Sequence, residues 1–276
     1  MAGFFGFFNY EKEGPGIEKD APKKKAFVVF FETFFRNIWK FMSVNAVYWL
    51  MCIPIITSGL ANVGITNVTR NIARDKHSFM LSDFFETIKK NWKQATIVTV
   101  INTIVYLLVF FALRFYYFSK GKFAVVGVGM CLAFIIVFSL MNFFIWTLMI
   151  TFNFSVKQLY SNSFKFAFIN FGKNLLCGIL LLLVYAINIA LLFLFNKSWL
   201  FVLLIELLVA FLTFPAFRFL LIQFCTFDSI KKYIIDPYYK EHPGEDIEKR
   251  RDLGLEIEEE QNSEDETEDE TEDETE

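Results

Sequence analysis

Glu206 is the residue whose type and position most clearly suggest chemistry. It is the only charged residue in the apolar stretch from Ser198 to Phe217. A carboxylate inside a membrane is costly, and such groups often belong to proton or substrate sites. At about 1.5 Å per residue, Glu206 would lie roughly 12 Å deep and Arg114 about 6 Å from the outer end of its own span. One interpretation is structural: Glu206 pairs with Arg114, or its side chain snorkels to the membrane surface. The other is functional: Glu206 belongs to a proton or substrate site.

Other reactive residue types occur without the spacing that chemistry requires. The four cysteines lie within or at the ends of apolar segments, and their spacing fits neither zinc nor a redox pair. His77 and His242 lie far apart in polar loops, so we expect no metal site. We find no phosphate-binding loop, dinucleotide turn, nucleophile elbow or zinc-protease motif. We therefore expect no cofactor, no catalytic residue and no nucleic-acid partner, and predict that the chain is not an enzyme.

Long apolar stretches predict the helices that would position these residues. The chain is 55% hydrophobic and contains 37 phenylalanines. About 20 apolar residues suffice to cross a bilayer core of roughly 30 Å. Residues 41 to 69 are also uncharged, but this stretch is longer than one typical span and short for two full spans, so its number of crossings is ambiguous. Four clear spans are predicted at Gln94 to Phe118, Phe123 to Ile150, Leu175 to Phe195 and Ser198 to Ile222.

The basic residues indicate how residues 41 to 69 cross the membrane. Cytoplasmic loops are enriched in lysine and arginine. If this stretch crosses once, the basic loop from Arg70 to Lys93 lies outside; if it crosses twice, that loop and both termini lie inside. The second topology fits the charges, with a helix bend between Pro54 and Gly59. Since each arm is short for a full span, a re-entrant hairpin remains an alternative. We therefore expect a multi-pass cell-membrane protein with cytoplasmic N- and C-termini.

A repeated segment suggests three similar units. Residues 30–40 (FFETFFRNIWK) resemble residues 84–93 (FFETIKKNWK), and residues 164–173 form a weaker third copy. Helices rich in aromatic and basic residues lie at the headgroup level. Asp83 and Ser163 are the predicted N-caps of the second and third of these helices. The predicted fold class is an all-α integral membrane protein with about six transmembrane segments in three helical hairpins, each preceded by an amphipathic interfacial helix.

Charge separates the membrane region from the chain ends. The last 21 residues contain 14 acidic and no basic residues, whereas residues 1–255 have a net charge of +11. Dense like charge with little hydrophobicity predicts disorder. The predicted organisation is a cytoplasmic N-terminal segment (1–25), a helical membrane domain (26–228), a basic cytoplasmic segment (229–255) and a disordered acidic tail (256–276).

Four segments of the first half of the chain carry a family pattern. They are Gly6–Tyr10 with Gly14–Gly16, Cys52–Gly59, Asn67–Arg74 and Ser82–Lys93. They resemble the YesL family, a group of bacterial membrane proteins classified as a domain of unknown function. The resemblance is strong over residues 1 to about 110 and weaker to Asp228, although Leu60 replaces the proline often found after the glycine at position 59. It implies an accessory role near carbohydrate uptake, and it assigns no catalytic or binding residue.

The leading functional hypothesis is an accessory or regulatory membrane protein linked to carbohydrate uptake. Besides the lipid bilayer, its expected partner is a carbohydrate transporter complex, contacted through the amphipathic segments and basic loops. The alternative is a small-solute secondary transporter with Glu206 as the intramembrane coupling residue; an intramembrane enzyme is a third, weaker option. The sequence leaves the substrate, the partner's identity, the oligomeric state and the role of the acidic tail open.

Overall fold

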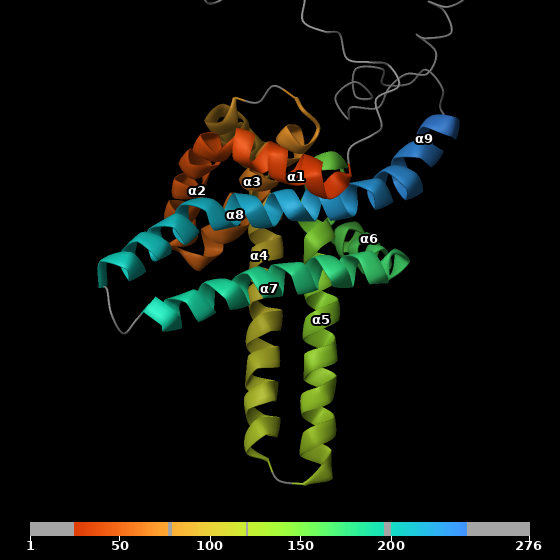
Figure 1. Ribbon diagram of the computed structural model, residues 1–276. Coiled ribbons are helices and arrows are strands. Elements are labelled where there is room, and N and C mark those ends of the chain that lie inside the picture. Colours follow the sequence, from red (N-terminus) through yellow and green to blue (C-terminus); the bar gives the residue numbers. More distant parts are fainter. Residues whose placement is uncertain (1–24, 77–78, 120, 196–199, 242–276) are drawn as a thin grey trace, which may run out of the picture.

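The computed structural model describes residues 25–76, 79–119, 121–195 and 200–241, without the side chains of 191–203 and 205–207. These residues fold into helices joined by short connections (Figure 1). A 3₁₀ turn and a π-helical stretch interrupt the α-helices. In chain order the elements are α1 (Ala26–Arg36), α2 (Ile38–Cys52), the 3₁₀ turn (Ile55–Thr57), α3 (Ser58–Ala73), α4 (Met80–Phe118), α5 (Lys122–Thr151), α6 (Val156–Ile169), α7 (Phe171–Phe195), α8 (Leu200–Ile230), the π-helical stretch (Lys231–Ile235) and α9 (Asp236–Glu241).

Four helices in the described part are long and apolar enough to cross a membrane. They correspond to the four clear spans predicted from the sequence. The arms of the fifth stretch are helices α2 and α3, of 15 and 16 residues, which are shorter than a typical span. Six spans are therefore not confirmed. The candidate spans are Met80–Phe118, Lys122–Thr151, Phe171–Ala190 and Leu208–Glu241.

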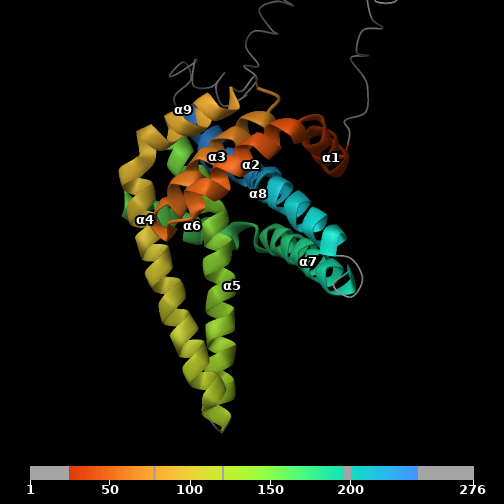
Figure 2. The same ribbon diagram turned by 90° about the vertical axis from the view of Figure 1, so that its left-hand side faces the viewer.

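The helical hairpins point in different directions. Helices α4 and α5 run side by side and project away from the rest of the molecule (Figures 1 and 2). Helices α7 and α8 also pair, but they run across the upper part of that hairpin, with α1 lying against α8. Because the pairs are neither parallel nor equal in length, the three equivalent hairpin units are not confirmed.

Helix α3 is the centre of the packed body because it contacts α2, α4, α5 and α8. Two glycines allow this close packing. A Cβ on Gly59 would lie 1.6 Å from the Thr99 hydroxyl oxygen and 2.8 Å from the Ala95 carbonyl oxygen of α4, and one on Gly64 would lie 2.6 Å from the Phe84 ring. Small residues at helix contacts let backbones approach closely in membrane proteins. The glycines therefore place α3 directly against α4.

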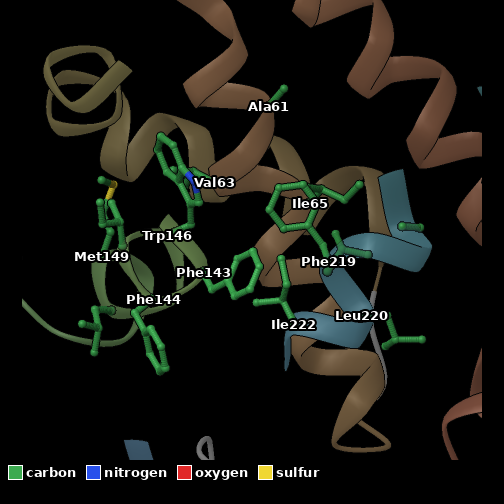
Figure 3. Close-up of a cluster of buried hydrophobic side chains, with 14 of the residues drawn as sticks. Ala61, Val63, Ile65, Phe143, Phe144, Trp146, Met149, Phe219, Leu220 and Ile222 are labelled. Carbon is green, nitrogen blue, oxygen red and sulfur yellow. The ribbon is translucent and has the colours of Figure 1, made fainter. Parts of the chain in front are cut away.

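The hydrophobic core lies where α3, α5 and α8 meet (Figure 3). Ile65 of α3, Phe144 of α5 and Leu220 of α8 are each fully buried. In contrast, many apolar side chains of the projecting part of the α4–α5 hairpin are exposed, Phe111 at 62% for example. Large exposed apolar surfaces mark contact with lipid or with other proteins. The packed core thus lies at the α3 end of the molecule.

The first two copies of the repeat each contain the same kind of hydrogen bond, from an asparagine side chain to the carbonyl of the threonine four residues earlier. Asn37 Nδ2 donates to the Thr33 carbonyl at 3.0 Å, and Asn91 Nδ2 donates to the Thr87 carbonyl at the same distance. Both threonines are buried. The backbone nevertheless differs, because the chain turns at Asn37 between α1 and α2 but continues helically through Asn91 in α4. The sequence repeat is therefore a repeat of local contacts, with two different helix directions.

The third copy departs from this pattern. Asn170 lies between α6 and α7, as Asn37 lies between α1 and α2, but its side chain donates to the Ser229 hydroxyl of α8 at 2.7 Å. Helix α6 begins with a capping box, in which Ser155 and Gln158 satisfy each other's backbone N–H groups. The predicted N-cap at Ser163 is therefore wrong, because that residue lies inside α6. The predicted N-cap at Asp83 is also wrong, because α4 begins earlier, at Met80.

Pro215 interrupts the hydrogen bonds of α8, and α2 supplies replacements. Proline lacks the N–H that would bond to the Phe211 carbonyl, and the indole Nε1 of Trp49 donates to that carbonyl at 2.8 Å. The Asn45 side-chain amide bonds to the next two backbone groups of α8, which would otherwise bond to each other. Its Nδ2 donates to the Leu212 carbonyl at 2.6 Å, and its Oδ1 accepts from the Ala216 N–H at 2.9 Å.

Asn45 and Trp49 can act together because they are four residues apart on α2 and so lie on the same helix face. Asn45 is fully buried. In an apolar environment each unsatisfied backbone group costs free energy, so these contacts stabilise the break in α8. Two helices far apart in the sequence are joined by three hydrogen bonds at this point.

Candidate functional site

The candidate functional site is the end of the body where α3 ends and α4 begins. Arg70, in the last turn of α3, and Arg74, the residue that ends this helix, lie beside α8. Lysines and acidic residues from the start of α4 surround this end, and Glu86 pairs with Lys90 at 2.7 Å. Arg36, the last residue of α1, bonds to the Asp75 carboxylate. Cationic side chains from three helices thus gather around the C-terminal end of α3.

Arg70 connects three helices. Its Nη2 donates to Asn67 Oδ1 at 2.8 Å, and its Nη1 donates to the Thr151 hydroxyl at 3.1 Å and to the Ile150 carbonyl at 3.4 Å. Asn67 in turn donates to the Thr87 hydroxyl of α4 at 2.7 Å. An arginine at the C-terminal end of a helix bonds favourably to the last carbonyls. Arg70 therefore fixes the end of α5 to α3, which is a positioning role.

Arg74 has different surroundings. Its guanidinium carbon lies 3.9 Å from the centre of the Phe227 ring of α8, a close cation–π contact. Burial, together with the nearby charge of Arg70, lowers the pKa of Arg74 to about 9. The group still carries its charge at neutral pH. Its Nη1 is buried and has no hydrogen-bond partner among the residues described.

The two arginines line a cavity of about 170 Å³ between α3 and α8. Gln223 of α8 lines it too. Its Nε2 donates to the Thr147 hydroxyl at 2.9 Å, while its buried Oε1 has no partner within the described part of the chain. The Asp228 carboxylate, which also lines the cavity, lies 3.8 Å from the Lys173 amine. The full lining is Arg70, Ala73, Arg74, Gln223, Phe224, Phe227 and Asp228.

A second cavity, of about 330 Å³, lies on the other side of Arg70, between α3 and the start of α4. Its lining is polar and carries both charges, including Asp83, Lys90 and Lys76. Its three basic and two acidic lining residues can pair with one another. The cavity beside Arg74 has two guanidinium groups and one carboxylate in its lining, and the Nη1 of Arg74 has no hydrogen-bond partner among the residues described.

Asparagines inside the apolar helices mainly connect helices. Asn102 Nδ2 of α4 donates to Asn142 Oδ1 of α5 at 2.7 Å, and the Tyr160 hydroxyl of α6 donates to Asn102 Oδ1 at 2.8 Å. Burial raises the pKa of the Tyr160 phenol, which keeps it a donor. Asn188 instead bonds within α7, to the Val184 carbonyl. Such bonds between helices are typical of packing in membranes.

The residues singled out by sequence lie elsewhere. The Glu206 side chain is outside those described, so its pairing with Arg114 stays a prediction; the Arg114 guanidinium lies near the Phe118 ring, 5.4 Å from its centre. Pro54 lies in extended backbone between α2 and the 3₁₀ turn, and Gly59 lies in the first turn of α3. Both residues therefore flank the connection between the two short helices.

The cysteines and histidines add no metal site within the described ranges, where no group of three or more His, Cys, Asp or Glu could hold an ion. His77 and His242 lie outside the described residues. The thiols of Cys177 on α7 and Cys225 on α8 share a hydrogen bond, although the sequence separates them widely. This contact joins the two helices of the α7–α8 pair.

The enclosure of Arg74 is not evident from the sequence, which predicts only a basic loop from Arg70 to Lys76. The available signal is the spacing of Arg70 and Arg74, which places both side chains on one helix face. The contact of Asn45 and Trp49 with α8 at Pro215 is not evident from the sequence either. The sequence features that could have indicated it are the spacing of four between Asn45 and Trp49 and the proline inside a long apolar run.

Within the described ranges, fold and site together define a helical protein of the membrane type, with a packed, basic end and an exposed apolar hairpin. Residues 41–113 match the model of a family described as "Protein of unknown function, DUF624". The matched region runs from α2 to most of α4 and includes both arginines of the cavity. Comparisons with curated proteins and with solved structures gave no match.

Proposed function

We propose that this chain is an accessory or regulatory membrane protein of the YesL-like kind, which binds another membrane complex rather than carrying out transport or catalysis itself. The partner class we propose is a carbohydrate transporter. In this proposal the basic end and both termini face the cytoplasm, in agreement with the preference of lysine and arginine for that side.

The observation that carries the proposal is the projecting α4–α5 hairpin. Its helices leave the packed body and expose apolar side chains, including Leu108 at 63% and Phe111 at 62% on α4 and Met130 at 70% on α5. A depression on these helices is lined mainly by apolar side chains, including Leu107 and Phe110 of α4 and Ile135 of α5. Such a surface fits lipid and the apolar helices of a membrane partner, and it offers little to a polar solute.

The polar side chains of the helices support the same proposal. Asn45, Asn102 and Asn142 all bond to other helices or to backbone. A secondary transporter requires polar groups that can exchange partners with its substrate near the membrane midplane. The described part of the chain uses its buried asparagines for packing instead, which favours a binding role over the transporter alternative.

The test is site-specific photocrosslinking in native membranes. The full chain would carry benzoylphenylalanine in place of Phe111 on the hairpin or, as a matched control, in place of Phe41, which is fully buried. We expect a discrete adduct with a permease subunit from position 111 and none from position 41. The proposal fails if position 111 yields only lipid adducts and the purified chain alone takes up solute in proteoliposomes. That outcome would support the transporter with Glu206 as its coupling residue.

A further inference from the structure

We propose that the cavity between α3 and α8 is a binding site for a phosphate group, held by Arg74 with Gln223. This site lies on a different surface from the hairpin and does not depend on the proposed partner. The charge of the cavity favours an anion, and its shape and its hydrogen-bonding groups favour a phosphate in particular.

Arg74 is a cation in an unfavourable position. It is largely enclosed, its charged neighbour Arg70 has the same sign, and Nη1 has no hydrogen-bond partner among the residues described. The Phe227 ring compensates for part of the lost hydration, but a ring cannot accept the N–H bonds in the guanidinium plane. A buried charge without a counter-ion is strongly destabilising unless a ligand supplies one.

The acidic residues nearby have other partners. Asp75, next to Arg74 in the chain, bonds to Arg36. Asp228 lines the cavity itself, and its carboxylate lies 3.8 Å from the Lys173 amine. The lining therefore carries two guanidinium groups and one carboxylate, so an excess of positive charge remains for a ligand.

Gln223 makes the site more specific than a charged surface. Its Oε1 is buried without a partner in the part of the chain described, and it lines the same cavity as Arg74. The Thr147 hydroxyl can accept from or donate to the amide, so Gln223 can present either its carbonyl or its NH₂ group to a ligand. A phosphate monoester offers oxygens to the guanidinium and either an oxygen or a hydroxyl to the amide.

The size and position of the cavity fit this ligand. A volume of about 170 Å³ is well above the roughly 10–15 Å³ that one water requires. Arginine binds phosphate through two parallel N–H bonds, which a planar guanidinium provides and an amine does not. The cavity lies at the basic end of the body, where α3 and α8 both approach their C-terminal ends. Lipid headgroups and phosphorylated small molecules share the required chemistry.

The experiment measures phosphate binding by the full-length purified protein. One arm titrates glycerol 3-phosphate and inorganic phosphate against protein in phosphatidylcholine nanodiscs, by isothermal calorimetry. The other arm compares the thermal stability of protein in nanodiscs of phosphatidylcholine alone with that in nanodiscs containing phosphatidylglycerol. Binding only in the first arm identifies a free phosphate ligand, and stabilisation only in the second identifies a lipid headgroup.

Arg74→Gln is the decisive variant, and Arg114→Gln is its matched control. Both remove one guanidinium charge, but Arg114 is exposed on α4 and is not among the residues that line the cavity. We expect Arg74→Gln to weaken binding at least tenfold, Arg74→Lys to restore it only in part, and Arg114→Gln to leave it within twofold. The proposal is overturned if the wild-type protein responds in neither arm, or if the two glutamine variants lose binding equally. Because Arg74 is an uncompensated cation, Arg74→Gln should fold at least as well as the wild type.

Discussion

Replacing Asn45 by alanine tests the most specific packing feature of the molecule, the support that α2 gives to the break in α8. The substitution leaves the Leu212 carbonyl and the Ala216 N–H without their partners. Each buried group left unsatisfied costs about 1–3 kcal/mol. Since α8 can partly close around the gap, we expect the free energy of unfolding to fall by about 2–4 kcal/mol, which is in the lower part of the sum of the two costs.

The measurement is reversible unfolding in mixed micelles, with increasing denaturing detergent and helicity as the signal. The matched control is Asn188→Ala, which removes the same amide from a site where it bonds only within its own helix, to a carbonyl already in the helical ladder. We expect that control to cost under about 1 kcal/mol, because the Val184 carbonyl keeps its bond within the helix when the amide is lost.

Combining Asn45→Ala with Pro215→Ala tests whether the amide acts by supporting the break in α8. Pro215→Ala restores the missing N–H, so α8 can form an ordinary ladder of hydrogen bonds without help from α2. In that background Asn45→Ala should lose at least half of its effect, a coupling of about 1 kcal/mol or more between contacting sites. If Asn45→Ala costs no more than Asn188→Ala, or costs the same with and without Pro215, then the amide does not support the break.

Two helix contacts and the charge of Arg74 lead to three further expected outcomes. Gly64→Val should destabilise by about 1–3 kcal/mol through overpacking, because a Cβ there meets the Phe84 ring at 2.6 Å, whereas Gly129→Ala, with open space around it, should be neutral in the same detergent titration. Tyr160→Phe should cost about 1 kcal/mol, the usual net value of one hydrogen bond, since its hydroxyl bonds to Asn102; a cost near zero would contradict a connecting role. The pKa of Arg74 is lowered from its usual 12.5 to about 9, so above pH 9 the unfolded chain binds this proton more tightly than the folded one. In phosphate-free buffer, the stability of the wild type relative to Arg74→Gln should therefore rise with pH above 9, and a flat difference would show that Arg74 is well solvated.

The long helices could be predicted because a single local property determines them. In a membrane, an apolar run of about twenty residues forms a helix because its backbone groups must bond to one another, unless a residue such as Pro54 breaks it. The run from Phe123 to Ile150 accordingly lies in α5, Lys122–Thr151. The start of α4 is harder to predict, because the composition of residues 84–93 favours a separate interfacial helix, whereas they continue into the span as one helix of 39 residues.

The site could not be predicted to the same extent because it depends on distant contacts. The two arginines are visible on one face of a helix, but nothing near them in the sequence indicates that Phe227 and Gln223 of α8 enclose Arg74. The crossing direction of α7 and α8 likewise depends on distant contacts, because α8 packs against α1, α2 and α3 and α7 packs against α8. Hydropathy shows which segments are apolar, and it contains no information on which of them meet.

The shared hydrogen bond at Asn37 and Asn91 has a consequence for how such a chain can change over time. The two segments make the same local contact, yet the first contains one additional residue, Ile38, before its tryptophan. One residue rotates the rest of a helix by about 100° and advances it by about 1.5 Å. Inserting or deleting a single codon at this position thus changes which face of the following helix meets the rest of the protein. A duplicated unit could acquire a new orientation in one mutational step while keeping its anchoring contact intact.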